Sequence, residues 1–167
     1  ISNLKVIDYI KYDDQGIALR NSLLQDAVLK SNRDKIFPAI RELLLYMSTY
    51  VYEGRQDVWM NVFQALLNEA RLREKFKSEK SELGTLFYGI KQEYTKVSYY
   101  WLQLGLYEQG ENNYAKALSH LKKSQKIQPK SFKIQHAIAR NYLKYANVQS
   151  DSQTAKELFE KGEKLML

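Results

Sequence analysis

The 167-residue sequence predicts an all-α fold, an array of antiparallel helix hairpins that follows a short N-terminal β-hairpin. Three observations support this fold class. From about residue 34 onward, apolar residues recur at helical spacing. Two prolines and seven glycines are few enough to suit helices and argue against a fold with many turns. A helix hairpin also returns with a period of 34 residues, the offset from Leu104-Gly105 to Ile138-Ala139.

Residues 1–31 are expected to form a separate N-terminal piece. Two short apolar runs within 6–20 flank a turn signal at 13–16, a pattern that predicts a β-hairpin. Ser22 and Gln25 have the spacing of a capping box, which predicts the start of a short helix.

Residues 32–167 are expected to form the helical array, with six helices in three hairpins. Pro38 is tolerated only in a first helical turn, so it fixes the start of the first of these helices. Gly54 ends that helix, and Asp57 can cap the next. The expected helices span about 34–52, 59–70, 82–109, 114–128, 132–145 and 154–165.

The third of these helices is the least regular in sequence. Its apolar spacing continues from Glu82 to Gln109, and no Gly-Pro punctuation lies between Tyr94 and Trp101. One long helix is the simplest interpretation, and a break near Thr95 is the alternative.

The last two hairpins carry a recognisable motif. Trp101, Leu104 and Gly105 follow a W-x2-L-G pattern, Ala117 is small where two helices would cross, and Pro129 closes the unit. A second copy places comparable residues at Ile138, Ala139, Tyr142, Ala155, Phe159 and Gly162.

These residues resemble the tetratricopeptide-repeat family over about 98–166. The resemblance implies a right-handed α-solenoid, with its best repeats at 98–131 and 132–167. It also implies that two helix backbones approach closely at Gly105 and Ala117. Trp101, Leu121 and Phe159 would then fill the space around that contact.

The N-terminal string YIKYDDQGIALRNSLLQDAVL resembles the wing hairpin and following helix of the winged-helix module in STAND-type signalling ATPases. A free-standing hairpin that caps the solenoid is the open alternative. No G-x4-G-K phosphate loop occurs in the 167 residues, so any ATPase would lie in another segment. The first residue is Ile1, and we therefore expect the sequence to be part of a longer protein.

No combination of residues points to catalysis, and we expect a non-enzymatic protein without a cofactor or a metal. The chain has no cysteine, and its two histidines, His120 and His136, have no Asp or Glu near them in sequence. Both are expected to be surface or groove residues. The serines, histidines and aspartates form no recognisable nucleophile motif.

The positive charge of the chain is concentrated in one window. Between Asn112 and Ser150 there is no Asp or Glu, whereas the chain as a whole has a net charge of +7. Four side chains of this window fall on one helix face, and the resemblance places that helix beside a concave groove. An apolar and aromatic wall next to a cationic wall suits a peptide with acidic groups or a free carboxylate. The expected contact residues are Tyr99, Leu102, Gln103, Leu106, Lys133, His136, Arg140 and Lys144.

The predicted function is therefore protein or peptide recognition by a scaffold or sensor module of a larger cytoplasmic signalling protein. The alternatives are a nucleic-acid-binding array that uses the basic window 116–144, and a regulatory part of a STAND-type ATPase. The absence of cysteine fits a reducing compartment, and no apolar run approaches the ~20 residues that span a bilayer. The end of the chain at 164–167 lacks a polar capping helix. Either the array continues or a partner, including a second copy, covers this end.

Overall fold

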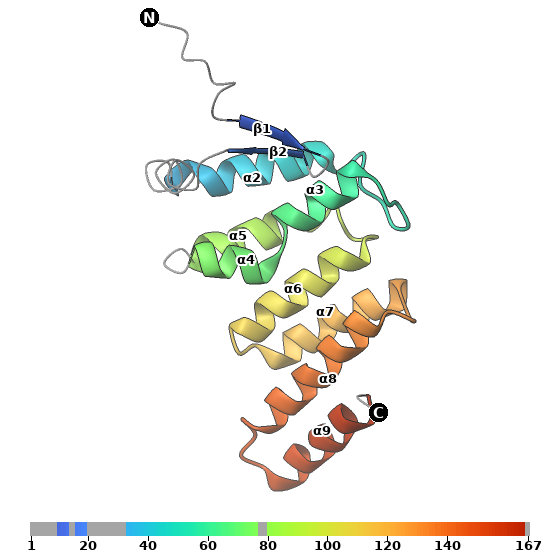
Figure 1. Cartoon of the computed structure of the whole chain (residues 1–167). Coiled ribbons are helices and arrows are strands. Elements are labelled where there is room, and N and C mark those ends of the chain that lie inside the picture. The colour runs from blue at the N-terminus through green and yellow to red at the C-terminus, as the bar shows by residue number, and fades with distance from the viewer. Residues whose placement is uncertain (1–9, 14–15, 20–32, 77–79, 166–167) are drawn as a thin grey trace, which may run out of the picture. The chain divides into compact units, whose positions relative to one another are not determined.

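The computed structural model describes residues 10–13, 16–19, 33–76 and 80–165, and these residues are almost entirely helical (Figure 1). The all-α prediction is confirmed. Two four-residue strands, β1 (Ile10–Asp13) and β2 (Gly16–Leu19), pair antiparallel with Ile10 opposite Leu19. The helices are α2 (Arg33–Met47), α3 (Val58–Leu66), α4 (Glu69–Lys75), α5 (Lys80–Gly89), α6 (Ser98–Gly110), α7 (Tyr114–Ile127), α8 (Phe132–Ala146) and α9 (Ser152–Lys164). The short helix predicted after Ser22 lies outside the described residues.

The chain separates into two compact units, residues 1–39 and 40–167. The first contains β1, β2 and the N-terminal part of α2. Pro38 is the sixth residue of α2 and lies inside the helix, so the prediction that it marks the first helical turn is wrong. The division predicted at residue 31 stays a prediction. The second unit contains the remaining helices.

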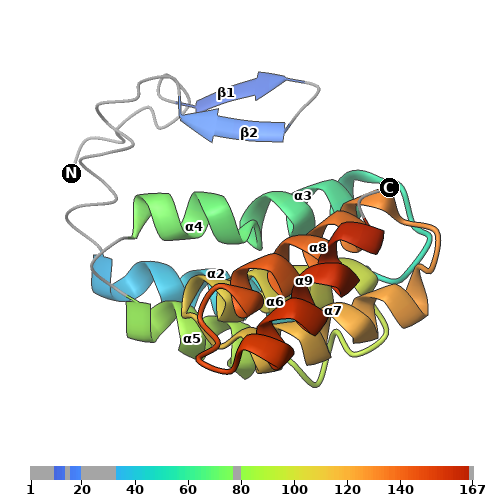
Figure 2. The same ribbon diagram turned by 90° about the horizontal axis from the view of Figure 1, so that it is seen from below.

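Within the second unit, helices that follow one another in sequence pack against one another. α6 packs on α7, α7 on α8 and α8 on α9, and the four lie side by side in both views (Figures 1 and 2). Buried residues on α6, α7, α8 and α9 share one apolar cluster, which includes Leu102, Leu121, Ile138 and Leu158. No helix in the described part of the chain combines the length and apolar character needed to cross a bilayer.

The single helix predicted over 59–70 is wrong, because the chain starts a new helix at Glu69. Asn68 has extended backbone angles, and its side chain accepts a hydrogen bond from the backbone N–H of Arg71 at 3.0 Å. That N-cap ends α3 and begins α4. The apolar stripe nevertheless continues across the break, because Phe63 and Leu67 are both buried.

The long helix predicted over 82–109 is also wrong, and the alternative break is where the structure has one. α5 ends at Gly89 and α6 begins at Ser98. The segment between them is held by buried side chains. The Tyr94 hydroxyl donates to the carbonyl of Leu44, and the Trp101 indole N–H donates to the carbonyl of Thr95 at 2.8 Å. Backbone turn hydrogen bonds, together with these side-chain bonds, therefore replace the helical ones that the periodicity predicted.

α6 and α7 approach each other closely at Gly105. A Cβ atom on this residue would lie 2.7 Å from Leu121 Cδ2 and 3.3 Å from the carbonyl oxygen of Ala117. The resemblance implied close contact of these helices at Gly105 and Ala117. Gly162 repeats the geometry on α9, where a Cβ would meet Leu143 at 2.9 Å and the carbonyl oxygen of Ala139 at 3.1 Å.

The role predicted for Phe159 is wrong. Its side chain is 45% exposed, whereas its neighbour Leu158 is buried in the cluster with Ile138 and Tyr142. Adjacent residues on a helix point about 100° apart. Leu158 therefore faces the core, whereas Phe159, one position later, points away from it. Phe159, the larger of the two side chains, is the one that faces solvent.

Candidate functional site

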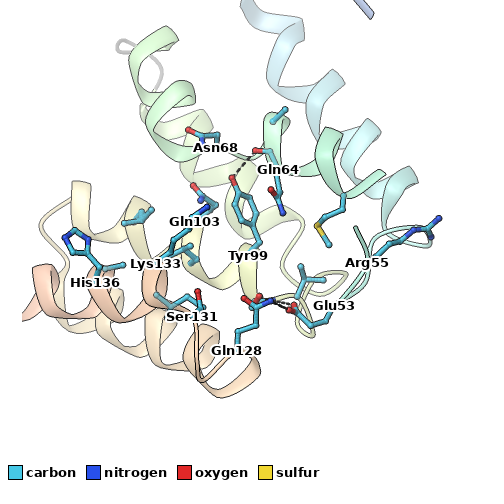
Figure 3. A pocket seen from close by; sticks show the side chains of 18 of the residues that line it. Glu53, Arg55, Gln64, Asn68, Tyr99, Gln103, Gln128, Ser131, Lys133 and His136 are labelled. Carbon is cyan, nitrogen blue, oxygen red and sulfur yellow. Dashed lines mark hydrogen bonds between the residues drawn. The ribbon is translucent and has the colours of Figure 1, made fainter. Parts of the chain in front are cut away.

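A groove of about 680 Å³ opens in the second unit (Figure 3). α6 supplies its floor, residues of α3 and α4 line one side, and the start of α8 lines the other. The turn at 53–56 adds residues beyond the start of α6. The groove therefore combines segments that are far apart in sequence.

Seven of the eight predicted contact residues line this groove. α6 contributes Tyr99, Leu102, Gln103 and Leu106, and α8 contributes Lys133, His136 and Arg140. Lys144 is exposed one turn beyond Arg140 and is not among the lining residues. The structure thus brings together the two faces that the sequence predicted to share a groove.

Sequence reasoning missed the opposite wall. Gln64, Asn68 and Arg71 line it, together with Glu53 and Arg55 from the preceding turn. The signal was present, because three of these residues are spaced three or four positions apart, as on one helix face. The segment carries no repeat motif, and its apolar stripe indicates only the side that faces the core.

Tyr99 connects the floor of the groove on α6 to the wall on α3. Its hydroxyl donates to the carbonyl of Gln64 at 3.0 Å, and its ring meets Phe63 edge-on with centroids 5.9 Å apart. Burial raises the pKa of Tyr99, against smaller lowering effects of Asn68 and Arg71. The side chain is therefore a neutral phenol near pH 7.

Gln103 lies beside Tyr99 on the floor and is buried. Its Oε1 accepts a hydrogen bond from the backbone N–H of Glu69 at 2.8 Å, which satisfies one of the free donors at the start of α4. Within the described part of the chain its Nε2 donates no hydrogen bond, which leaves an amide donor available to a ligand. Figure 3 shows Gln103 near Tyr99, Asn68 and Gln64.

Three cations line the groove without a carboxylate partner. Arg71, Lys133 and Arg140 are exposed, and no Asp or Glu of the described residues lies within ion-pair distance of them. Arg55 differs, because it forms an ion pair with Asp57. Cations without partners in a concave site are available to bind an anionic group.

Arg140 is held in place by a chain of amide side chains. Its Nε donates to Gln109 Oε1 at 3.2 Å, Gln109 Nε2 donates to Asn141 Oδ1 at 3.3 Å, and Asn141 Nδ2 donates to the carbonyl of Tyr114 at 3.0 Å. Gln109 and Asn141 are buried. This anchoring uses only Nε, so both terminal nitrogens of the guanidinium remain available for a carboxylate or phosphate.

The opposite end of α6 is anionic. Glu53 accepts hydrogen bonds from the backbone N–H of Ser98 at 2.7 Å, from the Ser98 hydroxyl at 3.1 Å and from the side-chain amide of Gln128. It is the only carboxylate among the lining residues. Ser98 and Gln109 are eleven positions apart on α6, which corresponds to roughly 16 Å. The one lining carboxylate therefore lies at one end of the floor, and Arg140 lies at the other.

The two histidines have different surroundings. His136 is exposed and stacks on Phe132 with centroids 6.2 Å apart. The surface position predicted for His120 is wrong: it is 8% exposed on α7, because its ring packs against Trp101 at 5.5 Å and Tyr88 at 6.4 Å. Among the residues that the structure describes, no three His, Cys, Asp or Glu side chains are placed to hold a metal ion.

The groove offers three kinds of interaction to a ligand. Leu102 and Leu106 give apolar contact, Gln103 and its neighbours give amide hydrogen bonds, and Arg140 with the other unpaired cations gives ion pairs. No protein-family model, no curated protein and no solved structure matches the chain.

Proposed function

We propose that the second unit recognises a segment of another protein, which it binds in an extended conformation along this groove. The observation that carries the proposal is the set of three unpaired cations, Arg71, Lys133 and Arg140, around a floor of apolar and amide side chains. An extended chain rises about 3.3 Å per residue, so roughly five residues would cover the ~16 Å between the two charged ends.

The positions of Glu53 and Arg140 at opposite ends of the floor set the charge that a partner segment should carry at each end. An acidic side chain, or a free carboxylate, is expected between Arg140 and its neighbouring cations, where both guanidinium terminal nitrogens are available. Glu53 would repel such a group from the other end. The amides of Gln64, Asn68 and Gln103 are suited to the main-chain groups of the segment between.

We further propose that the helices form a right-handed α-solenoid like that of tetratricopeptide repeats, as a scaffold or sensor module of a larger cytoplasmic signalling protein. The support is the sequential packing of α6 to α9 and the two glycine contacts at Gly105 and Gly162. An experimental structure would test the handedness directly.

The binding test uses labelled peptides of mixed sequence, one pool rich in Asp and Glu and one matched pool of Asn and Gln. Fluorescence anisotropy should show binding of the acidic pool that is lost in the Lys133→Glu/Arg140→Glu variant. A matched control, Lys161→Glu/Lys164→Glu on α9, makes the same charge change outside the groove and should bind as the unmodified chain does. Equal affinity of the groove variant and the control, with unchanged circular dichroism, would refute the proposal.

A further inference from the structure

A second cationic surface lies on α7, outside the groove. Lys116, Lys122, Lys123 and Lys126 are exposed along this helix. In the described part of the chain none of them has an ion-pair partner. The acid-free sequence between Asn112 and Ser150 explains why α7 supplies no compensating carboxylate.

A row of ring contacts brings a further lysine to this surface. Lys91 Nζ lies 5.9 Å from the Tyr88 ring, Tyr88 contacts His120, and His120 stacks on Trp101. Lys123 Nζ then lies 4.4 Å from the centre of the Trp101 ring. Lys91 from the α5–α6 connection and Lys123 from α7 therefore flank the same buried imidazole.

Lys116 completes the cluster from one helical turn before His120. Residues four positions apart on a helix share a face, so Lys116 and His120 lie on the same side of α7. Burial lowers the pKa of His120 to about 4, and Lys123, Lys91 and Lys116 act in the same direction. The imidazole is neutral near pH 7, and its Nδ1 has no hydrogen-bond partner among the residues that the structure describes.

Glu108 is the carboxylate that acts on His120, and its oxygens already have hydrogen-bond partners. Glu108 raises the pKa of His120, but it is only 2% exposed. Its oxygens accept hydrogen bonds from the Tyr88 hydroxyl and from Asn113 Nδ2, the second at 2.7 Å. The lysine ammonium groups are left to solvent or to an external anion.

The composition of the surface indicates which polyanion it suits. No large apolar side chain of α7 is exposed, and the exposed ring at this surface, Tyr88, bonds through its hydroxyl to Glu108. Helices that lie on membranes insert large apolar residues, and protein interfaces have an apolar centre. The cations of this surface are all lysines, which provide point charges for phosphates and lack the planar fork with which arginine reads a base. We propose that Lys91, Lys116 and Lys123 form a site for the phosphate backbone of double-stranded nucleic acid, bound independently of base sequence.

The first test is a salt titration of the full chain with a short labelled DNA duplex of mixed sequence. Each phosphate contact contributes about 0.9 to the slope of log affinity against log salt. The Lys91→Gln/Lys116→Gln/Lys123→Gln variant should therefore bind with a slope shallower by about 2 to 3. The matched control Lys156→Gln/Lys161→Gln/Lys164→Gln on α9 removes the same charge and should keep most of the slope. Undetectable binding of the unmodified chain at about 50 mM salt, or an equal change in both variants, would overturn the proposal.

A second measurement locates the duplex. A phosphate beside the lysines should offset their repulsion and raise the pKa of His120 by about one unit in NMR titrations, whereas His136 serves as the internal reference. A bound duplex that leaves the pKa of His120 unchanged would place binding elsewhere and refute the site. Equal affinity for poly-glutamate or for vesicles with anionic lipids would refute a preference for nucleic acid. The groove variant Lys133→Glu/Arg140→Glu should retain the change at His120, so failure of the groove proposal and of this one can be told apart.

Discussion

The Nε of Arg140 on α8 donates a hydrogen bond to Oε1 of Gln109 on α6, over a distance of 3.2 Å. This bond links the cationic wall of the groove to its floor. Because Gln109 is itself bonded to Asn141, the position of the guanidinium depends on two buried amides that no ligand would touch.

Replacing Gln109 by alanine should therefore weaken binding of the acidic peptide pool although residue 109 does not line the groove. We expect a loss of about fivefold to tenfold, because Arg140 would lose its anchor and would be ordered only on binding. The side chain of Asn141 would also lose a partner, which should lower the free energy of unfolding by about 1 to 3 kcal/mol. Peptide anisotropy and urea unfolding measure the two effects. Gln153→Ala, on the exposed side of α9, is the control, and equal peptide affinity in both variants would contradict the anchoring role.

Acidification should destabilise the protein through His120. In the unfolded chain its pKa is near 6.5, and in the folded chain it is lowered to about 4, mainly by burial. Between these values the unfolded state binds a proton that the folded state does not, so stability falls as the pH falls from about 6.5 to 4. The full effect of one such group is at most about 3 kcal/mol.

The variant His120→Phe keeps the stacking on Trp101 and removes both the titrating group and the unpartnered Nδ1. Its stability relative to the unmodified chain should rise as the pH falls from about 6.5 to 4. Urea unfolding at several pH values gives the comparison, with His136→Phe as the exposed control. The same pH profile in both variants would show that His120 does not carry this acid sensitivity.

Replacing Gly105 by alanine should separate α6 from α7. The new Cβ would lie 2.7 Å from Leu121 Cδ2 and 3.3 Å from a backbone carbonyl that cannot move alone. Overpacking of this kind typically lowers the free energy of unfolding by about 1 to 3 kcal/mol. Gly89→Ala provides the contrast: its Cβ would meet only the flexible side chain of Arg41, at 3.0 Å, so a small change is expected. A Gly105→Ala variant as stable as Gly89→Ala would argue against the close approach.

Removal of Glu53 should weaken the start of α6. Its carboxylate accepts the backbone N–H of Ser98, which has no partner within the helix, so Glu53→Ala should destabilise the fold by about 1 to 2 kcal/mol. Thermal unfolding would detect this as a lower Tm. Glu42→Ala is the matched control, because Glu42 forms only an exposed ion pair with Arg41 and should change stability by less than about 0.5 kcal/mol. Similar melting of the two variants would exclude a capping role.

The features that sequence predicted well depend on local spacing. The motif that carries the resemblance places Gly105 and Ala117 within one hairpin, and the contact between α6 and α7 requires a small residue at Gly105. The basic face of α8 followed equally from residues one turn apart, and its first three members line the groove.

The features that sequence missed depend on partners far away in the chain. The sequence near Tyr94 gives no sign that its hydroxyl will bond to the carbonyl of Leu44, fifty positions earlier. The buried state of His120 depends on Trp101 and Tyr88 from two other segments. The polar wall at Gln64 becomes part of a site only because α6 and α8 pack opposite to it.

The connection between α5 and α6 also bears on how fast a segment could bind. Tyr94 bonds this connection to the carbonyl of Leu44 on α2, and Trp101 bonds to the carbonyl of Thr95 within it, so the connection is unsuited to act as a hinge. The floor of the groove on α6 would then be preorganised, with the same shape in the free and the bound protein. Association would need no closing step, and its rate constant is expected in the ordinary range of about 10⁵ to 10⁷ M⁻¹s⁻¹, raised at low salt by electrostatic steering toward the unpaired cations.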